Sequence, residues 1–246
     1  MAPSARLTRP EESTCLDYYG GSRANREPVS FVSWHTANVS ELTLYGESSW
    51  VSPWVFHALV ALEELGKPYR LELFPLPIPA PLGANLARKS VLAKVPCLVH
   101  GDLWLTESSA ISEYLHETFP SARLYPADPM PRARARQLMS WLRTALHALR
   151  EERPTSSVFQ RPLRKSLSEK ARADAAELVR VAEQMLPIGA THLFGAWSIA
   201  DADLAMALMR LIANEDPIPQ RLHEYALAQW ARPSVRKYLS YVPTNR

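Results

Sequence analysis

Hydrophobic and polar positions divide the chain into a first half of short segments and a second half with helical spacing. Between residues 41 and 123 the pattern predicts strands at 42–45, 69–74, 97–99 and 103–105, and helices at 53–65, 84–90 and 109–119. Pro53 and Gly66 mark the two ends of the first helix. Alternating prolines at 75–81 predict an extended loop, because proline has no backbone N–H. This order of strands and helices is typical of a thioredoxin-like sheet.

The second half of the chain is predicted to be entirely helical. Apolar residues at helical spacing predict helices at 132–152, 168–186, 199–213, 220–230 and 234–241, with a loop at 153–165. Ser198-Ile-Ala-Asp201 has the form of a capping box at the start of one of these helices. The fold class is therefore α+β: a thioredoxin-like domain at 41–123, a proline-rich linker at 124–131 and an all-α C-terminal domain at 132–246.

Residues 1–40 do not share either pattern. They mix Pro, Ser, Arg and Glu without sustained periodicity. A segment of this composition cannot bury enough apolar surface to offset the entropy lost on ordering. We therefore expect a disordered N-terminal extension.

Composition and charge exclude several classes of protein. The net charge of +3 is too small to indicate a nucleic-acid binder, and no apolar run approaches the ~20 residues that span a bilayer. The two cysteines, Cys15 and Cys97, are too few and too far apart for a disulfide framework, and the histidines lack the spacing of a metal site. We expect a cytoplasmic protein with no metal, no nucleic-acid partner and no membrane partner.

Three short motifs bear on chemistry, although each has an ordinary structural explanation when it is taken alone. Ser52-Pro53-Trp54 opens the first helix, where a serine commonly acts as the N-cap. Val95-Pro96 precedes a strand, where proline is common at an edge. Glu107-Ser108-Ser109-Ala110-Ile111 lies between a strand and a helix, which again suits a cap. Their order and spacing along the chain are more informative about function than any single motif.

Together these motifs resemble the glutathione transferase superfamily. Ser-Pro-aromatic after the first strand, Val-Pro before the third and Glu-Ser-Ser-Ala-Ile before the next helix occur in that family's order, followed by a similar linker and helical domain. The serine at position 52 is similar to the serine-type classes, whereas omega-type enzymes carry Cys-Pro-Phe there. The segment 150–159 is similar to a bacterial subgroup.

The resemblance implies a role for each residue of the three motifs. Ser52 would donate a hydrogen bond to the glutathione thiolate. Val95, before a cis Pro96, would pair with the cysteinyl backbone of glutathione. Ser108 and Glu107 would bind the carboxylate and the ammonium of the γ-glutamyl group. Lys94 would assist at the glycyl carboxylate, although solvation on the surface is an alternative for this side chain.

The electrophile is expected to bind between the two domains. Trp50, Trp54 and Trp141 are candidates for its pocket, since aromatic walls suit apolar ligands, and core packing is an equal alternative for Trp141. Glutathione would then be a co-substrate whose thiolate attacks a small electrophile or a peroxide. Alternatives are a glutathione-dependent isomerase or a non-catalytic binding protein on the same fold. The family also implies a homodimer.

Other side chains near the first helix compete with Ser52. Tyr45 ends the first strand, where tyrosine-type transferases place their catalytic hydroxyl, and Ser48 and Ser49 lie in the following loop. Cys97 falls in a predicted core strand, so we expect a buried, unreactive thiol.

Overall fold

The structure is a computed structural model that describes residues 41–119, 121 and 123–243, all within one compact unit. The extension predicted at 1–40 lies outside the described residues.

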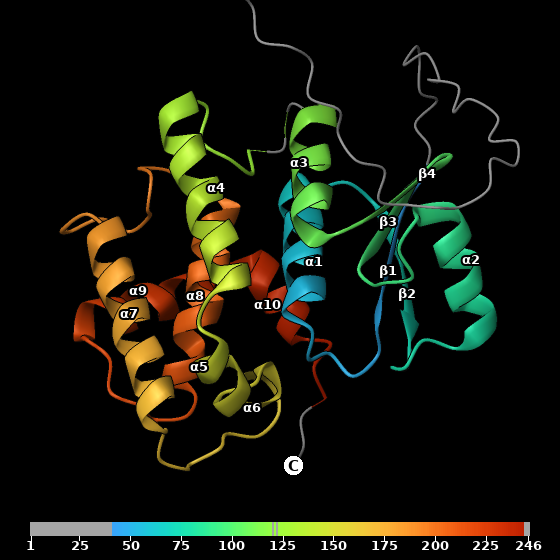
Figure 1. The fold of residues 1–246 in the computed structure, drawn as a ribbon. Coiled ribbons are helices and arrows are strands. Elements are labelled where there is room, and N and C mark those ends of the chain that lie inside the picture. The colour runs from blue at the N-terminus through green and yellow to red at the C-terminus, as the bar shows by residue number, and fades with distance from the viewer. Residues whose placement is uncertain (1–40, 120, 122, 244–246) are drawn as a thin grey trace, which may run out of the picture. The chain divides into compact units, whose positions relative to one another are not determined.

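A four-stranded mixed sheet with helices on both faces makes up the first half of the described chain (Figure 1). Its elements are β1 (Leu42–Glu47), α1 (Pro53–Leu65), β2 (Tyr69–Phe74), α2 (Ala80–Ser90), β3 (Cys97–His100), β4 (Leu103–Thr106) and α3 (Ser108–Thr118). β1 pairs with β2 in parallel and with β3 antiparallel, and β4 continues antiparallel to β3. α1 and α3 lie on one face, and α2 lies on the other. The prediction of a thioredoxin-like domain is confirmed.

Helix α1 is the central element of this half. Ser52 caps its start, Pro53 occupies the first turn and Gly66 ends it in the left-handed conformation at φ 67°. Its side chains from Val55 to Leu62 are buried without interruption, so the helix has no solvent face over two turns. It packs on α3 and β1 on one side and on helices of the second half on the other.

The second half is all-helical, as the sequence predicted. Its helices are α4 (Pro129–Thr144), α5 (His147–Glu152), α6 (Thr155–Phe159), α7 (Glu169–Met185), α8 (Ile199–Ile212), α9 (Gln220–Trp230) and α10 (Pro233–Leu239). Helix α8 is buried along almost its whole length and contacts α1, α4, α7 and α9. Its predicted capping box, Ser198 with Asp201, is present. α1 and α8 therefore hold the two halves against each other.

Several predicted boundaries were wrong. The single helix expected at 132–152 is two helices, because Leu146 takes the left-handed conformation at φ 59° and turns the chain between α4 and α5. The loop expected at 153–165 contains the short helix α6. Helix α2 starts at Ala80 and includes Pro81, which its first turn tolerates because an N–H there has no intrahelical acceptor.

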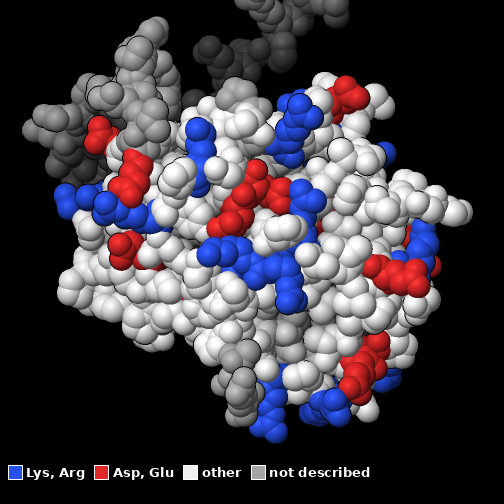
Figure 2. Space-filling view, turned by 180° about the vertical axis from the view of Figure 1, so that it is seen from behind, with Lys and Arg blue, Asp and Glu red and all other residues white. Residues whose placement is uncertain are grey.

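The described surface carries charges of both signs. On the face drawn in Figure 2, basic and acidic side chains are intermixed, in keeping with exposed ion pairs such as Arg70–Glu41 and Arg180–Glu177. Among the described helices, none combines the length and the hydropathy that crossing a bilayer would need.

Candidate functional site

Ser52 is the N-cap of α1. Its backbone is extended (φ −76°, ψ 119°), and its Oγ accepts a hydrogen bond from the backbone N–H of Val55 at 3.3 Å. A hydroxyl that accepts one bond still has its own proton to donate. The side chain is half-buried, and the two residues that follow, Pro53 and Trp54, line a cavity. Ser52 can therefore donate to a group bound at the positive end of α1.

The buried carboxylate of Glu47 organises the loop that leads to Ser52. Its Oε1 accepts from the backbone N–H groups of Val51 at 2.7 Å and Ser52 at 2.9 Å. Its Oε2 accepts from the N–H of Ser49 at 2.7 Å and from the Ser49 hydroxyl. Glu47 is fully buried, so these four donors replace the water that it has lost. Sequence reasoning missed this residue, because a glutamate at a strand end usually faces solvent.

The residues predicted to bind glutathione lie together around one cavity of about 460 Å³. Lining it are Lys94, Val95, Pro96, Glu107, Ser108, Trp54, Arg143 and Arg150. The Val95–Pro96 peptide bond is cis. The cavity thus brings together the loop before β3, the start of α3 and the first turn of α1.

Helix α3 presents two different side chains to this cavity. Ser108 is its first residue and is 5% exposed. Glu107, just before it, has φ 69° and makes no capping bond with its side chain. The Glu107 carboxylate lies 3.8 Å from the Lys94 ammonium, and both are exposed. A helix start and a carboxylate side by side suit a ligand that carries an anion and a cation close together.

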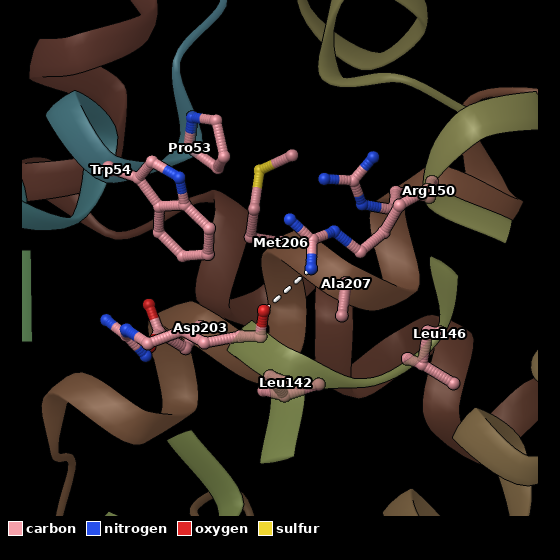
Figure 3. A pocket seen from close by; sticks show the side chains of 10 residues that line it. Pro53, Trp54, Leu142, Leu146, Arg150, Asp203, Met206 and Ala207 are labelled. Atoms are coloured by element: carbon pink, nitrogen blue, oxygen red, sulfur yellow. Dashed lines mark hydrogen bonds and ion pairs between the residues drawn. The ribbon is translucent and has the colours of Figure 1, made fainter. Parts of the chain in front are cut away.

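A second, smaller cavity of about 40 Å³ adjoins the first, and Trp54, Arg143 and Arg150 line both. Its other lining residues are Pro53, Leu142, Leu146, Asp203, Met206, Ala207 and Arg210. Figure 3 shows Trp54, Met206 and Arg150 pointing toward one another across it. The guanidinium groups of Arg143 and Arg150 lie 5.2 and 5.7 Å from the centre of the Trp54 ring. Sequence reasoning identified Trp54 as a pocket residue and singled out the segment 150–159 without giving Arg150 a role, and it did not identify Arg143.

A buried chain of polar groups runs behind the small cavity. The carboxylate of Asp203 pairs with Arg143 at 2.6 Å and with His57 Nδ1 at 2.7 Å, while His57 Nε2 lies 3.0 Å from the Ser112 hydroxyl. Burial alone would raise the pKa of Asp203, but the positive charges of Arg143 and His57 hold it at about 2. These ion pairs and hydrogen bonds connect α1, α3, α4 and α8.

Two of the three predicted tryptophans lie elsewhere. Trp50 is 5% exposed and stacks on Tyr241, with Tyr238 at its edge, so it is part of the core. Trp141 faces a different cavity, between α4 and α7. Neither residue lines the cavities beside Ser52. Trp50 is held instead by aromatic side chains of α10 and of the residues just after it. Trp141 lies on the opposite side of α4 from Arg143, because residues two positions apart on a helix point about 200° apart.

The three competing residues take part in other interactions. Tyr45 stacks between Phe74 and Trp104, and burial together with the charge of Glu72 raises its pKa, which disfavours an activated phenolate. The Ser49 hydroxyl donates to Glu47, and the backbone N–H of Ser48 donates to the Phe74 carbonyl.

Cys97 is completely buried in β3, as predicted. Burial raises the pKa of its thiol to about 11, despite an opposing hydrogen bond with Ser90. Among the described residues no three His, Cys, Asp or Glu side chains gather as metal ligands.

Comparison with known proteins agrees with this geometry. Residues 51–118 match the glutathione S-transferase N-terminal domain, and residues 128–243 match the C-terminal domain of the same family. A solved glutathione transferase homolog from Burkholderia GL BGR1, with bound glutathione, is 32% identical at a TM-score of 0.65, covering 81% of this chain and 96% of that one. A theta class enzyme from Xanthomonas axonopodis pv. citri, 21% identical with a TM-score of 0.64, shares the fold over 81% of this chain and 97% of its own.

Curated relatives match over shorter stretches. Glutathione S-transferase T1 of Arabidopsis thaliana is 35% identical over 140 residues, which are 53% of this chain and 57% of the relative. Glutathione S-transferase U1 of the same plant is 38% identical over 87 residues, 35% of this chain and 38% of the relative. The chain therefore matches less than two thirds of the length of these relatives. The two domain matches nevertheless cover residues 51–118 and 128–243, and the Burkholderia homolog is matched over 96% of its own length, so the chain belongs to the glutathione S-transferase family.

Proposed function

We propose that this protein is a glutathione transferase, in which Ser52 stabilises the thiolate of bound glutathione for attack on a small electrophile. The supporting observation is the position of Ser52 at the start of α1, two residues before Trp54, which lines the same cavity as Val95 and Ser108. A homodimer and a cytoplasmic location belong to this proposal on the family resemblance alone.

The proposed role of Ser52 is to lower the pKa of the glutathione thiol. A free thiol has a pKa of about 8.5, so most of it is protonated at neutral pH. A downward shift of about two units requires roughly 2.7 kcal/mol of preferential stabilisation of the thiolate. One hydroxyl donor and the positive end of a helix together supply interactions of that size. The Ser52 hydroxyl is oriented for this because it accepts its own bond from Val55.

The peptide part of glutathione fits the larger cavity. The backbone N–H and C=O of Val95 would pair with the cysteinyl unit as an added strand does. The γ-glutamyl carboxylate would bind at the start of α3 beside Ser108, and its ammonium would bind Glu107. Lys94, 3.8 Å from Glu107, would assist at the glycyl carboxylate.

The reaction would be a displacement at an electrophilic carbon or an addition to it, with the glutathione sulfur as the nucleophile. In an addition, the electrons of the attacked π bond move to its far atom, which takes a proton from solvent. The thiolate forms a C–S bond with an electrophilic carbon, the leaving group departs with the electron pair of the broken bond, and the thiol proton has already passed to solvent. Attack on a peroxide oxygen is the other reaction that the same thiolate would support. Mixed-disulfide chemistry with the protein is disfavoured, because Ser52 has no sulfur and Cys97 is buried.

The test is the ultraviolet band of the bound glutathione thiolate, followed against pH. Ser52→Gly removes the hydroxyl at a cost of only a few tenths of a kcal/mol in capping, and Ser52→Thr keeps both the hydroxyl and the cap. We expect the midpoint to rise by about one pKa unit or more in Ser52→Gly, because a hydrogen bond to a charged group is worth about 1.5–3 kcal/mol. Ser52→Thr should stay near the wild-type midpoint. Equal midpoints in wild type and Ser52→Gly would refute the role of Ser52.

A further inference from the structure

The small cavity contains more positive than negative charge. Three guanidinium groups line it, from Arg143, Arg150 and Arg210, but only one carboxylate, that of Asp203. The Asp203 carboxylate already has two partners, Arg143 at 2.6 Å and His57 at 2.7 Å. Two guanidinium groups therefore face the cavity without a counter-charge from its walls.

Arg150 is the first of these two groups. It is half-buried, and its Nη1 donates to the carbonyl of Arg143 at 2.7 Å. Its guanidinium faces the Trp54 ring at 5.7 Å. It forms no ion pair with any carboxylate among the residues that the structure describes. A carbonyl and an aromatic face neutralise much less of a guanidinium charge than a carboxylate does.

Arg210 is the second group, and it is 8% exposed. Its Nη1 donates to the backbone carbonyl of Arg153, and the guanidinium of Arg153 donates two hydrogen bonds to Asp216, at 2.6 and 2.8 Å. Burial, together with the nearby positive charge of Arg150, lowers the pKa of Arg210 to about 10. The positive charge of Arg150 thus adds to the cost of burying the Arg210 guanidinium, a cost that an anion bound between them would reduce.

Six other arginines of the described chain have a carboxylate partner. Carboxylates pair with Arg70, Arg136, Arg153, Arg164, Arg180 and Arg232. Four of these pairs include a side chain that is at least 45% exposed, where water could have solvated the charge without an ion pair. The half-buried Arg132 and Arg221 also have no carboxylate and donate to backbone carbonyls, so what sets Arg150 and Arg210 apart is that both line the small cavity.

The size and the walls of the cavity indicate what kind of anion it accepts. A volume of about 40 Å³ suits one small group such as a carboxylate and is too small for glutathione. Leu142, Leu146 and Met206 supply apolar walls, and the shared Trp54 leads to the larger cavity. This combination fits an anionic group attached to an apolar body that extends toward the thiolate position.

The carboxylates of glutathione are the obvious competitors for these arginines. Arg143 and Arg150 do line the larger cavity, and Arg143 Nη2 lies 3.4 Å from the Ser108 hydroxyl. Arg210, however, lines only the small cavity, on the α8 side. A glutathione bound at Val95, Glu107 and Ser108 leaves Arg210 without an anion, so the second anion must come from the other substrate.

We propose that the electrophile used by this protein carries a small anionic group, of the size and charge of a carboxylate, that binds between Arg150 and Arg210. This inference rests on the proposed function, since the apolar body of the electrophile must reach the thiolate beside Ser52. The segment 150–159, which the sequence analysis singled out, then has two roles: Arg150 binds the anion, and Arg153 holds Arg210 in place through its carbonyl.

The experiment compares pairs of glutathione conjugates that differ only in this charge. S-(carboxyphenyl)glutathione, with the carboxylate ortho, meta or para, is titrated into the protein by calorimetry beside the matching uncharged carboxamide. Since the readout is binding, it does not require turnover. We expect one carboxylate isomer to bind about tenfold more tightly than its carboxamide, as one desolvated charge-assisted contact implies.

Two variants test whether Arg150 causes the preference for the carboxylate. In Arg150→Met the preference for the carboxylate should fall at least fivefold, while Arg134→Met, which removes an exposed arginine of α4 outside the cavity, should retain it. The inference is overturned if no carboxylate isomer is preferred, or if Arg150→Met weakens both members of a pair equally, since the arginine would then serve glutathione. Absence of binding by glutathione and by every conjugate would overturn the proposed function as well.

Discussion

The carboxylate of Glu47 accepts a hydrogen bond from the backbone N–H of Ser52 at 2.9 Å, so the last residue of β1 directly fixes the first turn of α1. The same oxygen accepts from Val51, and the other oxygen binds Ser49. The loop before the catalytic candidate is therefore held by one buried side chain. We expect Glu47 to act as a positioning residue, because its bonds go to three backbone N–H groups and the Ser49 hydroxyl and it lines neither cavity.

Removing this carboxylate should affect both stability and the thiolate. We expect Glu47→Ala to lower the free energy of unfolding by about 3 kcal/mol, because several buried N–H groups lose their acceptor. It should also raise the pH midpoint of the bound thiolate by at least half a unit, since the Ser52 hydroxyl would lose its fixed position. Glu47→Gln keeps one acceptor oxygen and should give intermediate values. Urea unfolding and the thiolate band measure the two effects, and an unchanged thiolate midpoint in folded Glu47→Ala would limit Glu47 to a structural role.

Asp203 should make the free energy of unfolding depend on pH between 3.8 and about 2. Its pKa falls from 3.8 to about 2 on folding, so its contribution is present above pH 3.8 and is lost as the pH falls through about 2. By linkage this contribution amounts to about 2 kcal/mol. The stability difference between wild type and Asp203→Asn, measured by urea unfolding from pH 5 to pH 2, should therefore shrink as the pH falls. Asp102→Asn, an exposed control, should follow wild type; a difference for Asp203→Asn that is constant with pH would contradict the prediction.

The fold could be predicted from the sequence where strong local signals coincide. Pro53 and Gly66 framed α1 to the residue, because one suits the first turn and the other the left-handed C-cap. The break between α4 and α5 could not be predicted. Ala145 and Leu146 carry no turn signal, and the left-handed backbone of Leu146 is imposed by tertiary packing, since its side chain is 6% exposed.

The candidate site also contains residues that the sequence could predict and residues that it could not. Ser52, Val95 and Ser108 could be found because they lie within short contiguous motifs, and the structure brings these motifs to adjoining cavities. Arg143, Arg150 and Arg210 are scattered over three helices, and an arginine on a helix is ordinarily a solvated residue. Only the break at Leu146 and the burial of α8 turn these three side chains toward one space. Nothing local in the sequence carries that information.

The pair Arg153–Asp216 should contribute strongly to stability. Arg153 is 2% exposed and makes two hydrogen bonds to Asp216 and one to the carbonyl of Lys165. Arg153→Met leaves Asp216 without its partner, so we expect a loss of about 3–5 kcal/mol in urea unfolding. The neighbouring exposed pair Arg164–Glu215 offers a matched control, and Arg164→Met should cost less than about 1 kcal/mol. Similar losses for the two variants would show that burial of Arg153 does not have the assumed effect.

Cys97 should be unreactive in the folded protein. Its thiol is completely buried in β3, and burial raises its pKa to about 11, so at pH 8 only about one molecule in a thousand carries the thiolate that reacts. We expect iodoacetamide to modify Cys97 at least a hundredfold more slowly than a cysteine in an unfolded peptide, and at the peptide rate after denaturation in urea. Mass spectrometry of the peptide that contains Cys97 separates this thiol from Cys15. Fast labelling of Cys97 in the native protein would bring a protein sulfur within reach of glutathione, and the argument for conjugation over mixed-disulfide exchange would then rest on Ser52 alone.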